Sequence, residues 1–169
     1  MRILLALALL LPIVPATLAS PLLKPGDAFP AWSLRDQTGV KVSSTDLAGK
    51  TYLLWFYPKA MTPGCTAEGR GLRDEFEAFR QHGVEIVGVS FDDPVTNAAF
   101  VKTEGFPFRL LSDESHRLAV GVGAADSTDA PVTRRVSYLV GPDGKILHVY
   151  DAVNPASHAK DVLGDLARH

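Results

Sequence analysis

Two apolar runs, joined by a segment of helical pattern, most constrain what this chain can fold into. The first run covers residues 52–57 and the second residues 84–90. Between them, Leu72, Phe76 and Phe79 recur at helical spacing with charged residues interspersed. Near-continuous apolar strands are typical of parallel sheets that are covered on both faces. The pattern therefore predicts a strand–helix–strand unit within an α/β domain.

The remaining pattern predicts how this unit is extended. Strands are expected at 51–57, 84–90, 108–111, 135–140 and 145–150. Helices are expected at 64–81, from 94 to about 103, at 115–120 and from 154 to about 167. The pattern also predicts a β-hairpin around 36–39, a helical turn at 43–47 and a small, polar and mobile loop at 121–133. This order is that of a thioredoxin-like fold, a central mixed sheet flanked by helices, with an N-terminal β-hairpin extension. It brings the end of strand 51–57 near the start of strand 135–140.

The first twenty residues are typical of a cleavable signal peptide. Arg2 supplies a positive charge, residues 3–11 are apolar, and residues 16–20 supply small side chains for cleavage. The apolar run is about half as long as a membrane-spanning helix needs. We therefore expect a signal peptide at 1–20, one domain at 21–169, and a periplasmic or secreted protein.

Charge and histidine spacing exclude several classes of function. The formal net charge is −2 and no basic block occurs, so nucleic-acid or anionic-membrane binding is not supported. The five histidines, at 82, 116, 148, 158 and 169, share no metal-ligand spacing. His82 is expected at a helix end and the others on the surface, and no metal or cofactor is expected.

The chain contains one cysteine, Cys65, just after the first apolar run. This position lies on a strand-to-helix turn, where unpaired N–H groups and the helix dipole favour a thiolate, the nucleophilic form. A free cysteine is also often a small buried hydrophobe. Both interpretations remain open on position alone.

The residue types around Cys65 favour the reactive interpretation. Pro58 and Pro63 stiffen the loop, and Gly64 allows a close approach of the backbone. Thr62 carries a hydroxyl that can donate a hydrogen bond, although it could instead cap the following helix. Further along, Arg135 supplies a permanent cation, although it could equally be a surface charge.

Pro58, Thr62 and Cys65 match the Pro-x-x-x-Thr-x-x-Cys signature of peroxiredoxins. The run 57–66 resembles the bacterioferritin-comigratory-protein branch, also called peroxiredoxin Q. Further blocks at 25–30, 71–74, 111–113 and 135–146 extend the resemblance over nearly all of the chain after the leader.

This resemblance implies a thiol-dependent peroxidase that reduces hydrogen peroxide and organic hydroperoxides without a cofactor. It implies that Cys65 attacks the peroxide, and that Thr62, Arg135 and the N–H groups of Gly64 and Cys65 stabilise the reacting oxygens. Arg134 has similar chemistry to Arg135, and only the alignment of the block 135–146 selects Arg135.

By the same resemblance, Glu68 would orient Arg135, and Trp55, Phe56 and Pro58 would shield the site from water. Each has a plainer alternative. Glu68 suits the first turn of a helix because its charge opposes the dipole. Trp55 and Phe56 lie in an apolar strand and suit the core.

One departure from the branch determines the mechanism. Arg70 occupies the position where commoner members carry a second cysteine, so no intramolecular disulfide can form. A Cys65 sulfenic acid would need an external thiol, such as a thioredoxin-like protein, glutaredoxin or glutathione. The alternatives are a peroxide-sensing relay that forms mixed disulfides and an inactive binding module. A monomer or weak dimer is expected.

Overall fold

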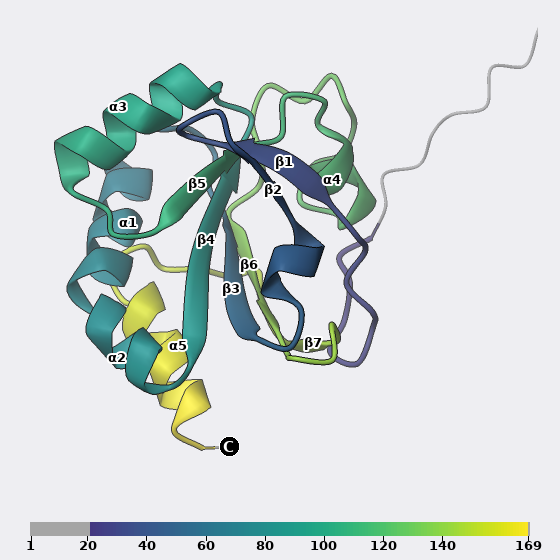
Figure 1. The fold of residues 1–169 in the computed structure, drawn as a ribbon, viewed down its shortest axis with the longest axis vertical. Helices are drawn as coiled ribbons and strands as arrows, with labels where there is room; N and C mark the ends of the chain where they lie inside the picture. Colours follow the sequence, from purple (N-terminus) through teal and green to yellow (C-terminus); the bar gives the residue numbers. More distant parts are fainter. Residues whose placement is uncertain (1–20, 169) are drawn as a thin grey trace, which may run out of the picture.

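The computed structural model describes residues 21–168. The signal peptide expected at 1–20 and His169 lie outside the described residues. The elements in chain order are β1 (Ser33–Asp36), β2 (Lys41–Ser43), the 3-10 turn η1 (Ser44–Leu47), β3 (Thr51–Phe56), α1 (Pro63–Asp74), α2 (Phe76–Gln81), β4 (Val84–Ser90), α3 (Pro94–Glu104), β5 (Arg109–Ser112), α4 (Arg117–Gly121), β6 (Val136–Val140), β7 (Ile146–Tyr150) and α5 (His158–Leu166) (Figure 1).

The strands form one mixed sheet in the order β2-β1-β5-β4-β3-β6-β7. Strands β3, β4 and β5 are parallel neighbours, as the apolar runs predicted, and β6 pairs antiparallel with β3. In that pairing Phe56 lies opposite Val136, so the end of β3 and the start of β6 are adjacent. The predicted α/β fold is confirmed, and the segment that leads from β3 to Cys65 lies beside the segment that carries Arg135 into β6.

Strand β3 divides the core into two layers because its side chains alternate between the faces of the sheet. Trp55 and Tyr57 pack with Cys65 in the layer covered by α1, α2, α3 and α5. Phe56 packs in the opposite layer. The expectation that Phe56 and Trp55 together wall the reactive site was therefore wrong for Phe56, since adjacent strand residues point in opposite directions.

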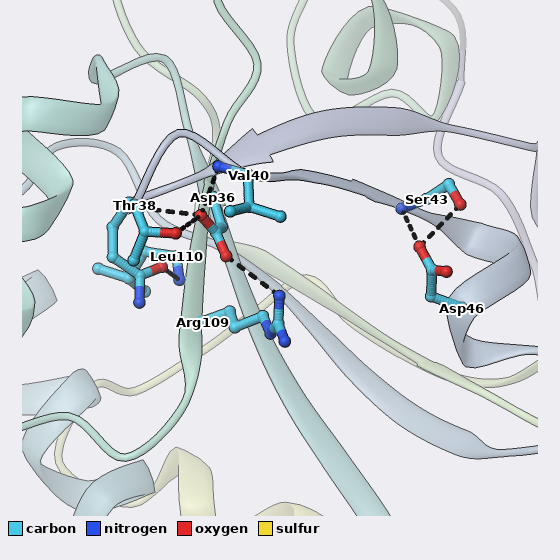
Figure 2. Close-up of polar contacts among 8 residues, drawn as sticks. Asp36, Thr38, Val40, Ser43, Asp46, Arg109 and Leu110 are labelled. Atoms are coloured by element: carbon cyan, nitrogen blue, oxygen red, sulfur yellow. Dashed lines mark hydrogen bonds and ion pairs between the residues drawn. The ribbon is translucent and has the colours of Figure 1, made fainter.

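The N-terminal hairpin is held to the sheet by the buried carboxylate of Asp36. Its Oδ1 accepts hydrogen bonds from Thr38 N at 2.8 Å and Val40 N at 3.1 Å, while Oδ2 accepts one from Arg109 at 3.1 Å (Figure 2). These hydrogen bonds lower the pKa of Asp36 even though burial acts in the opposite direction. The hairpin thereby extends the sheet beyond β5.

Two helix boundaries differ from the sequence-based prediction. The helix expected at 64–81 ends at Asp74, because Glu75 (φ −96°, ψ 8°) leaves the helical range, and α2 then begins at Phe76. The last helix begins at His158 rather than near 154, because Asn154 opens a separate turn whose carbonyl accepts from His158 N.

The polar segment 121–133 has neither helix nor strand beyond Gly121, yet it is anchored at several points. Ala124 and Ala125 are buried, and Arg134 N donates to the Ala124 carbonyl at 2.7 Å. The expectation of a small, polar and mobile loop was therefore wrong for its apolar part, which packs into the core. Within residues 21–168, no helix has the length and apolar character that a membrane span requires.

The fold makes a prediction about Gly69, which lies inside α1 where the helix meets the core. A Cβ at this position would come within 2.5 Å of the Phe106 ring and 3.1 Å of the Trp55 ring. We expect Gly69→Ala to lower the free energy of unfolding by about 1–3 kcal/mol through overpacking. Gly164→Ala, in α5 with nothing within 4 Å, is the matched control and should raise it by up to about 1 kcal/mol. Urea denaturation measures both, and equal effects would contradict the packing argument.

Candidate active site

The loop between β3 and α1 delivers Cys65 to the first turn of a helix. Thr62 occupies the N-cap position in an extended conformation and Pro63 begins α1. The Thr62 hydroxyl makes no capping hydrogen bond; it donates instead to the Lys59 carbonyl at 2.9 Å. Met61 has a φ of 61°, the left-handed conformation that non-glycine residues rarely adopt. The chain therefore turns sharply just before the helix.

Buried polar groups from β4, α3 and the loop before β6 fix this turn. The Asp92 carboxylate accepts from Ala60 N at 2.8 Å and from the Ser90 hydroxyl at 2.9 Å. The Tyr57 hydroxyl donates to Asn97 at 2.5 Å, and the Thr133 hydroxyl donates to the Tyr57 carbonyl at 2.8 Å. The sequence did not assign Asp92, Asn97 or Thr133 to this site, because contacts between distant segments leave no local pattern.

The fully buried Sγ of Cys65 lies 3.6 Å from Nη2 of Arg135. Gly64 makes this approach possible, because a Cβ there would stand 2.9 Å from the same nitrogen. The N–H groups of Gly64 and Cys65 precede the first helical hydrogen bond, from Thr66 N to Thr62 O, so the helix offers them no carbonyl. The sulfur thus lies beside a cation and a helix N-terminus, both of which favour a thiolate.

Glu68, one turn further along α1, holds Arg135 from the other side. Its buried Oε2 accepts a hydrogen bond from Nη1 of Arg135 in an ion pair. Burial raises the pKa of Glu68, and the charge of Arg135 offsets this in part. Burial disfavours the Arg135 cation, but Glu68 and then Cys65 favour it more, so the pKa of Arg135 is raised overall. The predicted neighbourhood of Glu68, Arg135 and Cys65 is therefore present.

His158 is a site neighbour that sequence reasoning placed on the surface. It is 2% exposed, and its Nε2 lies 2.9 Å from the Ser137 hydroxyl and 3.8 Å from Oε1 of Glu68. Burial lowers its pKa to about 4. The surface assignment was wrong because His158 shares a face of α5 with Val162, four residues on, which is fully buried. That helical spacing was the available signal.

Arg134 and Arg70, the other two arginines considered from the sequence, bind groups away from the sulfur of Cys65. Arg134 donates to the Gly123 carbonyl at 3.2 Å and pairs with Asp126, away from the sulfur. Arg70, at the position expected for a resolving cysteine in related proteins, binds Glu104 of α3 through two hydrogen bonds of 2.6 and 3.2 Å. The charge of Arg70 is therefore paired on the far side of α1 rather than directed at Cys65.

Trp55 and Pro58, which were expected to shield the site from water, lie in different environments. Trp55 is fully buried in the Cys65 layer, and its indole N–H lies near Glu68 without a hydrogen bond of ordinary geometry. Pro58 is half-buried in the bend that follows β3. Trp55 therefore backs the Glu68 carboxylate, while Pro58 shapes the entrance loop.

No other part of the described structure offers comparable chemistry. Residues 21–168 contain no group of three His, Cys, Asp or Glu side chains placed to hold a metal ion. A cavity of about 550 Å³ lies between η1 and α2, lined by side chains that include Leu47, Phe76 and Phe108, but it contains no cysteine, serine or histidine. The reactive arrangement is thus a buried thiol facing a guanidinium at a helix start. It suits nucleophilic attack on a small substrate whose leaving atom gains negative charge.

Comparison with known proteins identifies a family that uses such an arrangement. Residues 25–149 match the AhpC/TSA family. Peroxiredoxin Bcp of Escherichia coli K12 is 41% identical over 152 residues, which cover 87% of this chain and 97% of that relative.

Solved structures agree with this assignment. The crystal structure of peroxidoxin BcpB from Mycobacterium tuberculosis superposes with a TM-score of 0.80 at 31% identity, covering 86% of this chain and 97% of that one. The bacterioferritin comigratory protein of Xanthomonas campestris, in a study of its alkyl peroxide reduction activity, has a TM-score of 0.76 at 29% identity, covering 88% and 97%. The chain belongs to the AhpC/TSA family and is a peroxiredoxin of the bacterioferritin-comigratory-protein branch, a thiol-dependent peroxidase with a single cysteine.

Proposed function

We propose that Cys65 carries out the peroxidase reaction by attacking the terminal oxygen of hydrogen peroxide or an organic hydroperoxide. A sulfur–oxygen bond forms and the oxygen–oxygen bond breaks. The sulfur is oxidised by two electrons to a sulfenic acid, and the remaining oxygen leaves with a proton as water or an alcohol. The observation that supports this assignment is the 3.6 Å contact between Cys65 Sγ and the Arg135 guanidinium at the start of α1.

The surrounding donors support distinct roles in this step. Arg135 stabilises the thiolate before attack and the negative charge on the departing oxygen during it. The N–H groups of Gly64 and Cys65 point from the helix start, and the Thr62 hydroxyl stands at the N-cap beside them. We assign the two N–H groups to the peroxide oxygens, and Glu68 to holding Arg135 in place. The Thr62 hydroxyl donates to the Lys59 carbonyl in this structure, so we propose that its single O–H rotates toward the peroxide when substrate binds.

Organic hydroperoxides are proposed as substrates on two grounds. The Xanthomonas campestris relative is described by its alkyl peroxide reduction activity. In this chain, Met61 and Val132 are large apolar residues with exposed fractions of 50% and 37%. Each is adjacent in sequence to a residue of the active-site loop or its anchor, Thr62 and Thr133. They provide exposed apolar surface on the active-site loop and on the segment that anchors it, which suits an alkyl group.

The second half of the cycle needs a thiol from outside the chain, because Cys65 has no partner cysteine. An external thiolate would attack the sulfenic sulfur, form a mixed disulfide and release water; a second thiol would then restore Cys65. Cys65 is fully buried. A compact thiol such as glutathione reaches such a sulfur with less rearrangement than a folded thioredoxin-like protein or glutaredoxin. We therefore propose a small thiol as the resolving reductant.

The segment 1–20 supports a proposal about location. Its sequence is that of a cleavable signal peptide, so we propose export to the periplasm or to an equivalent compartment. Expression of the full chain in a Gram-negative host, followed by osmotic release and intact-mass measurement, should find a periplasmic protein that has lost about twenty N-terminal residues. A cytoplasmic product that retains Met1 would contradict the proposal.

The first half-reaction has a direct test in the reduced chain that lacks the leader. With one equivalent of peroxide, we expect Cys65 to gain one oxygen much faster than free cysteine does, and dimedone to trap the product. No intramolecular disulfide should form. Cys65→Ser is the control and should consume no peroxide. A wild-type rate equal to that of free cysteine would contradict the proposed function.

The same oxidised protein tests the second half-reaction. Glutathione should regenerate the thiol through an adduct on Cys65 that mass spectrometry detects, while a thioredoxin system at equal thiol concentration should act more slowly. Faster recovery with thioredoxin would overturn the small-thiol proposal. A stable mixed disulfide with another protein would support the sensing relay instead.

Arg135→Lys should slow oxidation of Cys65 by about 10- to 1000-fold, since a lysine cannot bind Glu68 and face the sulfur at once. Arg134→Lys is the matched control. Arg134 is a neighbouring arginine that pairs with Asp126, so this variant should react within about twofold of wild type. Stopped-flow Trp fluorescence measures both rates. Equal effects of the two substitutions would contradict the assignment of Arg135.

A further inference from the structure

The buried His158 is a feature of the site that the proposed reaction does not yet use. It begins α5, which lies beside α1 in the layer that contains Cys65 (Figure 1). A buried imidazole loses its hydrogen bonds to water, so its presence needs polar partners nearby. Ser137 of β6 provides one, at 2.9 Å from Nε2.

The second polar neighbour of His158 is Oε1 of Glu68, the carboxylate oxygen that Arg135 does not bind. Oε2 of Glu68 is bound by Arg135, whereas Oε1 is buried and makes no hydrogen bond to any residue in the range 21–168. Nε2 of His158 lies 3.8 Å from this oxygen. A movement of less than about 1 Å would bring the pair into hydrogen-bond range.

Burial favours the neutral form of His158, while the charges around it act in both directions. Glu68 of α1 and Arg135 face it across the site, Asp161 lies on its own helix, and the Tyr150 ring of β7 packs against it at 5.3 Å. Burial lowers the pKa of His158 to about 4; Asp161 opposes this shift and Arg135 adds to it. A neutral imidazole carries one N–H, which can be shared between Ser137 and Glu68 without placing a second cation beside Arg135.

We propose that His158 is a positioning residue of the peroxidase site, which uses Nε2, held by Ser137, to fix the Glu68 carboxylate so that Glu68 keeps Arg135 against Cys65. His158 then acts through Glu68 and Arg135 and contacts neither the peroxide nor the sulfur. The inference deepens the proposed function and rests on it. It also gives the C-terminal helix a part in the reaction, because α5 carries the imidazole.

A double-mutant cycle tests this chain of contacts. His158→Leu and His158→Gln are made in the wild-type and Glu68→Gln backgrounds, since leucine keeps bulk and glutamine keeps an N–H near the position of Nε2. We expect His158→Leu to slow Cys65 oxidation by about tenfold in the wild-type background and by less than about twofold in the Glu68→Gln background. His158→Gln should restore most of the wild-type rate. His82→Leu, at the exposed histidine that follows α2, is the control and should leave the rate unchanged.

A second readout does not depend on peroxide. At a fixed pH, alkylation of Cys65 by iodoacetamide should be about threefold slower in His158→Leu than in wild type, because Arg135 is then held less firmly beside the sulfur. If wild type reacts slowly with peroxide but the alkylation rate changes as expected, the proposed function fails and the positioning role stands.

Three results would overturn the positioning role. One is an unchanged rate of both peroxide oxidation and alkylation in His158→Leu. Another is an equal loss in both Glu68 backgrounds, which indicates packing alone. If His158→Leu does not fold, Ser137→Ala takes its place, because it removes the partner of Nε2. Ser137→Ala should slow Cys65 oxidation about threefold when Glu68 is present and have no effect in the Glu68→Gln background. The third overturning result is an equal effect of Ser137→Ala in both backgrounds.

Discussion

The ion pair between Glu68 and Arg135 is the interaction on which the site depends. The two residues are 67 positions apart in sequence, and Glu68 is fully buried. Removing one partner of a buried pair leaves an uncompensated charge, which typically costs about 3–5 kcal/mol. The fold brings them together because β6 pairs antiparallel with β3, so the segment before Val136 lies next to the turn that leads into α1.

In this ion pair, the guanidinium of Arg135 contacts Glu68 and Cys65 at the same time. One nitrogen of the guanidinium binds Glu68, and another faces the sulfur of Cys65 at 3.6 Å. A planar, forked cation can do both at once, whereas a point charge at the end of a flexible chain cannot. Gly64 is part of the same arrangement, since any Cβ there would occupy the space that the guanidinium uses. The reactive thiol therefore depends on two segments, α1 and the residues just before β6, neither of which is active by itself.

Sequence reasoning placed the parts of this site that leave a local signal. The apolar runs located β3 and β4, the proline and glycine before Cys65 located the helix start, and the aligned block at 135–146 separated Arg135 from Arg134. The burial of His158, the anchoring of the loop by Asp92 and the position of Phe56 on the opposite face were not found. The anchoring by Asp92 depends on contacts between distant segments, which a periodic pattern in one segment does not carry. The other two misses did leave a local signal: His158 stands at helical spacing from the buried Val162, and Phe56 alternates with Trp55 along its strand.

Arg70, at the position where the family resemblance implied a second cysteine, has a structural role in α1. Residues five apart in a helix are separated by about 7.5 Å along its axis, which exceeds the Cα spacing of about 7 Å that a disulfide tolerates. A cysteine at position 70 could therefore reach Cys65 only if α1 unwound. In this chain Arg70 instead clamps Glu104, and Arg73 donates to the Glu104 carbonyl at 2.7 Å. Both contacts fasten α1 to α3. The helix that presents Cys65 is thus held in its folded form, and the thiol that completes the cycle must come to it.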